Sequence, residues 1–555
     1  MKGLETTEPI ENVNTHTLTQ ISGSKAVLET LIHEGVDTIF GYPGGAIMPL
    51  YDALFDYKDH LRHILVRHEQ GAIHAAQGYA RTSGRVGVTF ATSGPGATNL
   101  ITGVADAMID SNPITTPITK WNYQVTEANE ISRVLAKAFY IARSGRPGPV
   151  LIDITKNALI QLFDYTGHKP CLHIRSYRPA PIVRESYIED AAHVINSAKK
   201  PLVLFGQGVI LGEAEEEFVT FIEKGGFPSA STVMGLSALE TQHPLHMGML
   251  GMHGNYAPNV LTNECDVLIA IGMRFDDRVT GRLDRYAKQA KVVHLDIDPA
   301  EIDKNVKTTV PVWGDCKETL FMLTALIKRS DHSDWLKKFR KLEKEEHKEV
   351  INKEFYPDSD AITMGEVVNV LNELTGGNAV IVSDVGQHQM IACRYAKFNH
   401  SKSNVTSGGL GTMGFGLPAA IGAWYGAPDR DVIAIVGDGG IQMTIQELGT
   451  IMQFGAKVKV LILNNGFLGM VRQWQQLFLD KRYSSVNITS PDFVAVANEY
   501  NIDGNKVSDR KDLRVALQTM IRHEKSYLLE IMVGKENNVF PMVAQGSGIS
   551  EIRLK

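Results

Sequence analysis

Short apolar runs, each ending in a glycine-rich or polar turn, recur along this 555-residue chain. Near the start they occupy residues 36–40, 64–66, 86–90 and 150–153, and the segments between them have a helical pattern. Continuous apolar runs of this length predict strands that are buried on both faces. Their alternation with helices indicates an α/β unit with a parallel sheet.

The same alternation returns twice further along the chain, so we predict an α/β protein made of three doubly wound parallel-sheet domains. A segment rich in Lys and Glu, residues 335–353, separates the second and third units and predicts a solvated helix and linker. The remaining predicted strands are, in chain order, 201–205, 267–272, 292–296, 379–382, 432–436 and 458–463.

Polar stretches set the expected domain boundaries. The acidic N-terminus has no apolar core, so we expect a disordered lead-in rather than a secretory or transit signal. The expected order is a lead-in (1–20), a first domain (21–164), a linker (165–190), a central domain (191–334), a charged helix and linker (335–360) and a third domain (361–545).

Composition excludes several classes of protein. Lys and Arg number 56 against 62 Asp and Glu, a net charge of −6, which argues against a non-specific nucleic-acid binder or a basic membrane-surface protein. The four cysteines are far apart and form no CxxC pair, so a disulfide framework is not expected and a reducing cytoplasm is. No apolar window approaches the roughly 20 residues of a membrane-spanning helix.

The strongest chemical signal is Gly437-Asp438-Gly439, followed after 24 residues by Asn464-Asn465. Each half comes directly after a predicted strand, and ligands of parallel sheets bind beyond the carboxyl ends of strands. Carboxylate and amide oxygens suit Mg²⁺, and glycines allow a diphosphate to approach the backbone. A lone Gly-Asp-Gly is equally well explained as a glycine turn, but the paired spacing favours a magnesium–diphosphate site.

This spacing resembles the cofactor motif of thiamine-diphosphate-dependent enzymes. Several further strings narrow the resemblance to the acetolactate synthase (acetohydroxyacid synthase) large-subunit family, over nearly the whole chain from about residue 20. They lie at 42–46, 67–72, 93–99, 274–281, 384–390 and 469–475.

The resemblance implies a site for thiamine diphosphate and Mg²⁺. Glu69 would be the catalytic carboxylate that hydrogen-bonds the cofactor's pyrimidine ring, although a Glu in a first helical turn is also favoured there by the helix dipole. Asp438, Asn465 and the main-chain carbonyl of Phe467 would ligate the metal. Residues implied in cofactor binding are Gln387, His388, Gly411, Met413, Gly437, Asp438, Gly439, Gly440, Asn465, Phe467 and Met470.

The resemblance also implies a flavin site in the central domain, and the alternative is an α/β domain without a ligand. Arg278 would bind a 2-oxo acid carboxylate, and Trp474 would shape the pocket for a second substrate. Without the family, a surface arginine and a core tryptophan explain both. The implied FAD residues are Arg146, Gly206, Gly208, His253, Gly254, Gly272, Arg274, Asp296, Asp298 and Asp315.

The chain departs from the family pattern after Pro113. The family has an apolar strand there, then a loop that brings a Gln and a Phe near the cofactor. Residues 113–117 are too few for a strand of about five or six residues that ends before Pro117. We therefore expect the first domain to lack one strand, and a catalytically impaired or non-catalytic homologue is an open alternative.

The implied reaction is acetolactate synthesis, a transferase reaction in which pyruvate loses CO₂ on thiamine diphosphate. The resulting hydroxyethyl carbanion attacks pyruvate or 2-oxobutyrate and gives 2-acetolactate or 2-aceto-2-hydroxybutyrate, the first common step toward valine, leucine and isoleucine. In the family, Glu69 and the diphosphate site come from different subunits, so a homodimer or homotetramer is implied, with a small regulatory subunit as a possible partner. A pyruvate oxidase-like flavin enzyme is the alternative activity.

Overall fold

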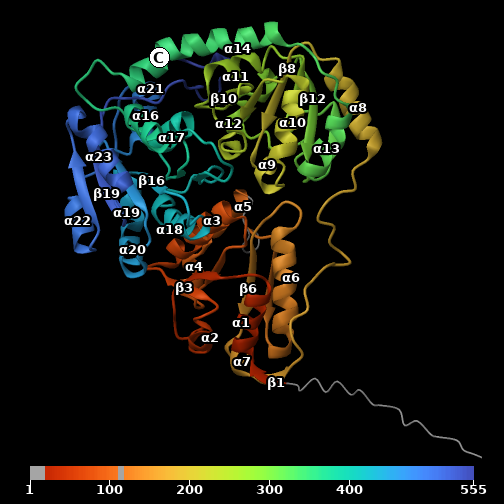
Figure 1. Cartoon of the computed structure of the whole chain (residues 1–555), viewed down its shortest axis with the longest axis vertical. Helices are drawn as coiled ribbons and strands as arrows, with labels where there is room; N and C mark the ends of the chain where they lie inside the picture. Colours follow the sequence, from red (N-terminus) through yellow and green to blue (C-terminus); the bar gives the residue numbers. More distant parts are fainter. Residues whose placement is uncertain (1–18, 111–117) are drawn as a thin grey trace, which may run out of the picture.

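A computed structural model of the protein describes residues 19–110 and 118–555. Three α/β units follow one another along the chain, with the first below the other two in Figure 1. Most of the predicted lead-in lies outside the described residues. Its last two positions belong to β1 (Thr19–Ser22), which pairs antiparallel with β7 (Leu162–Tyr165) at the far end of the first unit. Among the described residues, no helix has the length and apolar composition to span a membrane.

The third unit is built on a six-stranded parallel sheet. Every residue of its two middle strands, β16 and β17, is buried, as continuous apolar runs predict. The strand order is β15 (Asn404–Thr406), β14 (Val380–Ser383), β16 (Val432–Gly437), β17 (Lys459–Asn464), β19 (Tyr527–Met532) and β18 (Asp503–Val507).

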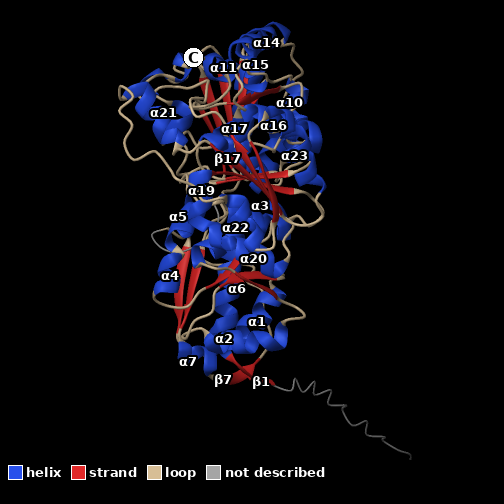
Figure 2. Cartoon of the chain, turned by 90° about the vertical axis from the view of Figure 1, so that its left-hand side faces the viewer, coloured by secondary structure: helices blue, strands red, loops and turns tan. Residues whose placement is uncertain are grey.

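Helices cover both faces of this sheet (Figure 2). The helices of the third unit are α16 (Met364–Thr375), α17 (Gln387–Tyr395), α18 (Gly416–Gly426), α19 (Asp438–Thr444), α20 (Leu448–Phe454), α21 (Gly469–Phe478), α22 (Phe493–Glu499) and α23 (Arg510–Arg522).

The central unit has a second six-stranded parallel sheet. Its strand order is β10 (His246–Met249), β9 (Ser229–Ser231), β8 (Pro201–Phe205), β11 (Val267–Ile271), β12 (Lys291–Asp296) and β13 (Val310–Trp313). Its helices are α8 (Glu185–Asn196), α9 (Gln207–Leu211), α10 (Glu215–Gly225), α11 (Tyr256–Leu261), α12 (Asp277–Thr280) and α13 (Cys316–Leu326).

The first unit has smaller sheets. Besides the β1–β7 pair, one contains β3 (Arg62–Leu65), β2 (Thr38–Gly41) and β4 (Val88–Phe90), and another contains β5 (Trp121–Val125) and β6 (Val150–Ile154). Its helices are α1 (Gly23–His33), α2 (Met48–Leu54), α3 (Glu69–Ser83), α4 (Pro95–Asn99), α5 (Ile101–Ile109), α6 (Ile131–Arg143) and α7 (Lys156–Ile160).

The strand predicted to be missing near 113–117 falls on positions outside the described residues. On either side of them, no strand pairing links the sheet of β4 to the sheet of β6 within the described ranges. Most residues of these two strands are only half-buried, whereas those of β16 and β17 are fully buried. Side chains of both nevertheless pack into one hydrophobic core, so the two sheets form a single domain.

The first and third units meet through α3 and α18, whose backbones touch. A Cβ atom added at Gly78 would lie 1.9 Å from the carbonyl oxygen of Ala419, and one at Gly422 would lie 1.7 Å from that of Ala75. Only glycine permits this approach, because any larger residue would collide with main-chain atoms that have no room to move. This contact fixes helix α3, which begins at Glu69, against the third unit (Figure 1).

The charged segment is helical but not simply solvated. It forms α14 (Ser333–Glu346), a π-helical turn (His347–Ile351) and α15 (Asn352–Phe355) across the top of the molecule in Figure 1. Trp335 and Phe339 are buried, and so is Glu346. The prediction of a solvated helix is therefore wrong for the face that carries these three residues. Their side chains pack between the central and third units.

Candidate active site

The ends of β16 and β17 are neighbours, as the spacing of the two motifs predicts. The strands are parallel, and Gly437 lies opposite Leu463, so Asp438 and Asn464 each come one position later on adjacent strand ends. Asp438 is also the first residue of α19. The main chain therefore turns from strand to helix at the carboxylate, where helix N-terminal N–H groups favour an anion such as a diphosphate.

The Asp438 carboxyl group is 1% exposed, and burial raises its pKa to about 6, while the backbone N–H of Asn465 opposes that shift. Among the described residues, its Oδ2 atom has no hydrogen-bond donor. A buried carboxylate oxygen without a donor is costly unless a cation or proton meets it. Asp438 is therefore suited to be a ligand of a divalent metal ion.

Asn465 and Gln387 lie side by side at this edge of the sheet. The Asn465 amide nitrogen donates to Gln387 Oε1 at 3.2 Å, and its Oδ1 atom accepts from the backbone N–H of Phe467 at 3.1 Å. A Cβ at Gly469, where α21 begins, would lie 2.2 Å from Gln387 Oε1, so a larger residue there would displace the Gln387 side chain. Among the described residues, no cluster of three or more His, Cys, Asp and Glu side chains could hold a metal ion. The predicted magnesium ligands would not form such a cluster, because only one of them, Asp438, is of these residue types.

His388 lies against the backbone of Gly437, where an added Cβ would be 2.8 Å from its ring. Burial lowers the pKa of His388 to about 4, so the ring is neutral near pH 7. Its Nε2 atom has no partner within the described part of the chain. This imidazole can therefore donate or accept one hydrogen bond without adding charge next to Asp438.

A fully buried carboxylate, Asp384, holds the loop that carries Gly411 and Met413. It accepts from the backbone N–H of Val385 at 2.7 Å and from that of Gly414 at 2.9 Å. Burial raises the pKa of Asp384 to about 7 against these hydrogen bonds. Asp384 is not among the predicted site residues, although it opens the family string at 384–390 and directly follows an apolar strand.

Glu69 is the first residue of α3 and is 8% exposed. Its Oε2 atom accepts from Asn99 Nδ2 at 2.9 Å. The backbone N–H groups of the two preceding residues, Arg67 and His68, donate to Glu447 of the third unit at 3.0 and 3.1 Å. The entry of α3 is thus anchored across the domain boundary, and the Glu69 carboxylate has a fixed position.

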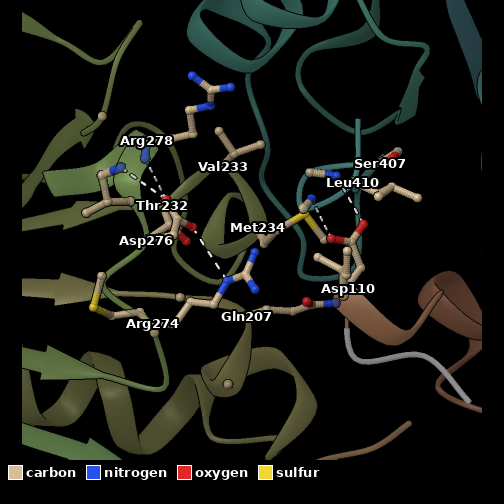
Figure 3. A pocket seen from close by; sticks show the side chains of 18 of the residues that line it. Asp110, Gln207, Thr232, Val233, Met234, Arg274, Asp276, Arg278, Ser407 and Leu410 are labelled. Atoms are coloured by element: carbon tan, nitrogen blue, oxygen red, sulfur yellow. Dashed lines mark hydrogen bonds and ion pairs between the residues drawn. The ribbon is translucent and has the colours of Figure 1, made fainter. Parts of the chain in front are cut away.

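A cavity of about 700 Å³ lies where the three units meet, a volume typical of cofactor sites (Figure 3). The predicted site residues that line it are Arg146, Gly206, Gly208, His253, Gly272, Arg274, Arg278, Asp296, Asp315, Gly411, Met413, Met470 and Trp474. Those that do not line it are Glu69, Gly254, Asp298, Gln387, His388, Gly437, Asp438, Gly439, Gly440, Asn465 and Phe467.

The flavin-type residues of this cavity do not all face it freely. Arg146 pairs with Asp298 at 3.2 Å and with Glu301 at 3.0 Å, which joins the first unit to the central one. A Cβ at Gly208 would lie 2.5 Å from the Cα of Gly272, so these two glycines also serve the close contact of two turns. Burial raises the pKa of Asp296 at the cavity wall to about 7.

Two of the three arginines that line the cavity, Arg274 and Arg278, differ in their pairing. Arg274 Nε lies 3.5 Å from Asp276 Oδ2, an ion pair marked in Figure 3. Arg278 is exposed, and among the described residues its side chain forms no ion pair. A guanidinium at a cavity wall without a carboxylate of its own is suited to bind one from a ligand.

Comparison with known proteins decides the family. The chain matches three family models: the N-terminal thiamine pyrophosphate-binding domain over residues 21–116, the central domain over 188–323 and the C-terminal thiamine pyrophosphate-binding domain over 384–531. It is 42% identical to the acetolactate synthase large subunit of Lactococcus lactis, over 95% of both chains. It is 43% identical to an acetolactate synthase of Mycobacterium bovis, over 97% of this chain and 92% of the relative.

The chain belongs to the acetolactate synthase large-subunit family of thiamine pyrophosphate enzymes. The same name is carried by a relative from Buchnera aphidicola, 40% identical over 96% of this chain and 99% of the relative. The resemblance inferred from the motifs is confirmed, and so is the predicted fold of three α/β domains. The family names favour acetolactate synthase over the pyruvate oxidase-like alternative.

Proposed function

We propose that this protein makes 2-acetolactate from two molecules of pyruvate, and 2-aceto-2-hydroxybutyrate when 2-oxobutyrate is the acceptor. The observation that carries the proposal is one cavity shared by the cofactor-side residues Met413 and Met470 and the substrate-side residues Arg278 and Trp474. The relatives' names support the same reaction. The product would enter branched-chain amino-acid synthesis in the cytoplasm.

Thiamine diphosphate, when bound, supplies the electron sink for cleaving the bond between C1 and C2 of pyruvate. Asp438, Asn465 and the Phe467 carbonyl would hold Mg²⁺, since Asp438 and Asn465 directly follow adjacent strands and the buried Asp438 oxygen has no donor among the described residues. Gln387, His388 and the glycines 437, 439 and 440 would contact the diphosphate. Gly411 and Met413 would hold the pyrimidine side.

FAD would occupy the arm of the cavity formed by the central unit. The cavity is large enough for a cofactor, and a carboxylate at the end of β12, Asp296, faces it as a possible partner for a ribose hydroxyl. Gly206, Gly208 and Gly272 lie on the same wall, where they also pack closely against one another. The ion pair of Arg146 with Asp298 would close one end of this arm.

Arg278 would orient the substrate, because a free guanidinium at the cavity wall matches a 2-oxo acid carboxylate. Trp474 would limit the space for the acceptor. Glu69 would hold a proton at the cofactor's pyrimidine ring. By the family resemblance, in which this carboxylate and the diphosphate site come from different subunits, we propose a homodimer or homotetramer in which Glu69 serves the partner's site, with a small regulatory subunit as a further partner.

Product analysis tests the proposal. Purified protein incubated with pyruvate, thiamine diphosphate, Mg²⁺ and FAD should form acetolactate, detected as acetoin after acid decarboxylation. Addition of 2-oxobutyrate should also give 2-aceto-2-hydroxybutyrate. Acetate with hydrogen peroxide would instead identify a pyruvate oxidase-like enzyme. Cofactor binding without any product would contradict the proposal in favour of a non-catalytic homologue.

A further inference from the structure

Helix α5 carries two buried acids that the reaction does not account for. Asp106 is 0% exposed and Asp110, directly after the helix, is 3% exposed. They are four residues apart, so both lie on one face of the helix, which is otherwise apolar. Two carboxylates on an apolar face are costly to bury unless each meets donors, and both face the loop at residues 407–412 of the third unit.

Asp110 binds the loop through its main chain. Its Oδ1 atom accepts from the backbone N–H of Gly409 at 2.6 Å, and its Oδ2 atom accepts from that of Gly408 at 3.0 Å. The Oδ2 atom also meets the Arg81 guanidinium at 2.9 Å. Figure 3 shows this carboxylate beside Ser407 and Leu410 at the cavity wall. Both carboxylate oxygens are therefore used as acceptors.

Asp106 binds the same loop through side chains, and only one of its oxygens is used. Its Oδ1 atom accepts from the Ser407 hydroxyl and from the Thr412 hydroxyl, the latter at 3.1 Å. Its Oδ2 atom has no partner among the described residues. The Ser407 hydroxyl in turn accepts from the backbone N–H of Thr412 at 2.8 Å, which closes the loop on itself.

Arg81 completes the connection from helix α3. Its Nη1 atom donates to the carbonyl of Thr406 at 2.6 Å, and its guanidinium lies 5.5 Å from the centre of the Phe415 ring. The loop is thus held at both ends by the first unit. Its residues 407–411 line the cavity, and so does Met413 directly after it.

The fit between the helix end and the loop is tight. A Cβ at Gly409 would lie 2.2 Å from Cγ2 of Ile109 and 2.6 Å from Oδ1 of Asp110. A side chain at residue 409 would therefore collide with the end of α5, and the hydrogen bonds to Asp110 hold the loop in this contact. These contacts fix the backbone on which Gly411 and Met413 depend.

We infer that Asp106 and Asp110 are positioning residues that hold the 407–412 loop in the shape needed to bind thiamine diphosphate. The inference rests on the proposed function for its catalytic consequence. The tether, by which the two acids hold the loop, follows from their hydrogen bonds alone. Neither acid contacts the strand ends that carry Asp438. Loss of either acid should therefore weaken cofactor binding through Gly411 and Met413 and leave the metal ligands in place.

The test compares substitutions that differ in which acceptor they remove. Both Asp110 oxygens accept from backbone N–H groups of the loop. Asp110→Asn replaces one of these oxygens with an NH₂ group, which cannot accept, so the variant should lose at least one hydrogen bond to the loop. We expect the half-saturating thiamine diphosphate concentration to rise about tenfold or more, with a smaller fall in kcat at saturating cofactor. Asp106→Ala should act in the same direction, and Asp106→Asn, which keeps Oδ1, should recover most of that loss.

A second readout does not depend on activity. Hydrogen exchange of the peptide covering residues 405–413 should speed up in Asp110→Asn and Asp106→Ala. Asp56→Asn is the matched control, since that carboxylate forms an exposed ion pair with Lys25 and should leave exchange unchanged. If Asp110→Asn does not fold, Thr412→Val removes one donor to Asp106 and should raise exchange in the same peptide.

The outcomes separate the inference from the proposed function. Wild-type exchange and wild-type cofactor affinity in both Asp110→Asn and Asp106→Ala would overturn the inference. Equal damage from Asp106→Asn and Asp106→Ala would also overturn it, because the retained oxygen would then have no role. A wild-type protein that forms no acetolactate, yet shows the expected exchange differences, would refute the proposed function and support the tether.

Discussion

Glu69→Gln is expected to lower the rate of acetolactate formation by a factor of about 10²–10⁴, the usual contribution of a positioned proton-transfer group. The amide has the size of the carboxylate, so the hydrogen bond from Asn99 and the start of α3 should persist. In the role proposed for Glu69, the variant would lose a proton acceptor at the cofactor's pyrimidine ring. The measurement is kcat at saturating pyruvate, thiamine diphosphate and Mg²⁺.

A matched variant separates this chemical effect from disturbed packing. Asn99→Ala removes the donor to Glu69 but leaves the carboxylate, so it should cost far less activity than Glu69→Gln. Both variants should keep the wild-type unfolding midpoint within a few degrees. Full activity in Glu69→Gln would exclude Glu69 as the catalytic carboxylate.

Glu346→Ala is expected to destabilise the protein by about 3–5 kcal/mol, because it leaves the Arg394 charge buried and unpaired. The two side chains are 1% and 0% exposed, with Arg394 Nη2 2.5 Å from Glu346 Oε1. The same guanidinium donates to the carbonyls of His253 and Gly254 at 2.9 and 2.7 Å. The pair therefore joins α14, the central unit and α17.

The control lies one turn earlier on the same helix. Glu343 pairs with Arg340 at a partly exposed site, so Glu343→Ala should cost about 1 kcal/mol or less. Denaturant unfolding of both variants, followed by tryptophan fluorescence, gives the comparison. Equal unfolding midpoints for the two variants would contradict the role given to the buried pair.

Local patterns carried much of the fold. Two apolar runs, one before Asp438 and one before Asn464, predicted buried strands with polar residues at their ends. In the structure these strands are neighbours in one parallel sheet. The strand prediction succeeds because a strand that is buried on both faces needs apolar residues at consecutive positions, and such a run is visible in the sequence. The polar residues beyond each run then fall at the same edge of the sheet without further information.

Contacts between distant segments could not be predicted in the same way. Glu346 sits in a run of charges, and its burial depends on Arg394, which lies 48 residues further along. Asp106 and Asp110 are held by a loop about 300 residues away. Their spacing of four within an apolar helix was a usable signal, since two acids on one buried face require donors.

The central claim is that the ends of β16 and β17 hold Mg²⁺ and, through it, thiamine diphosphate. Calorimetric titration of thiamine diphosphate into the wild-type protein tests it directly, with Mg²⁺ and then with EDTA, alongside Asp438→Asn. We predict binding that requires Mg²⁺ and is weakened at least about tenfold by Asp438→Asn, a loss of about 1.4 kcal/mol or more. Equal affinity with and without Mg²⁺, or equal affinity in Asp438→Asn, would contradict it.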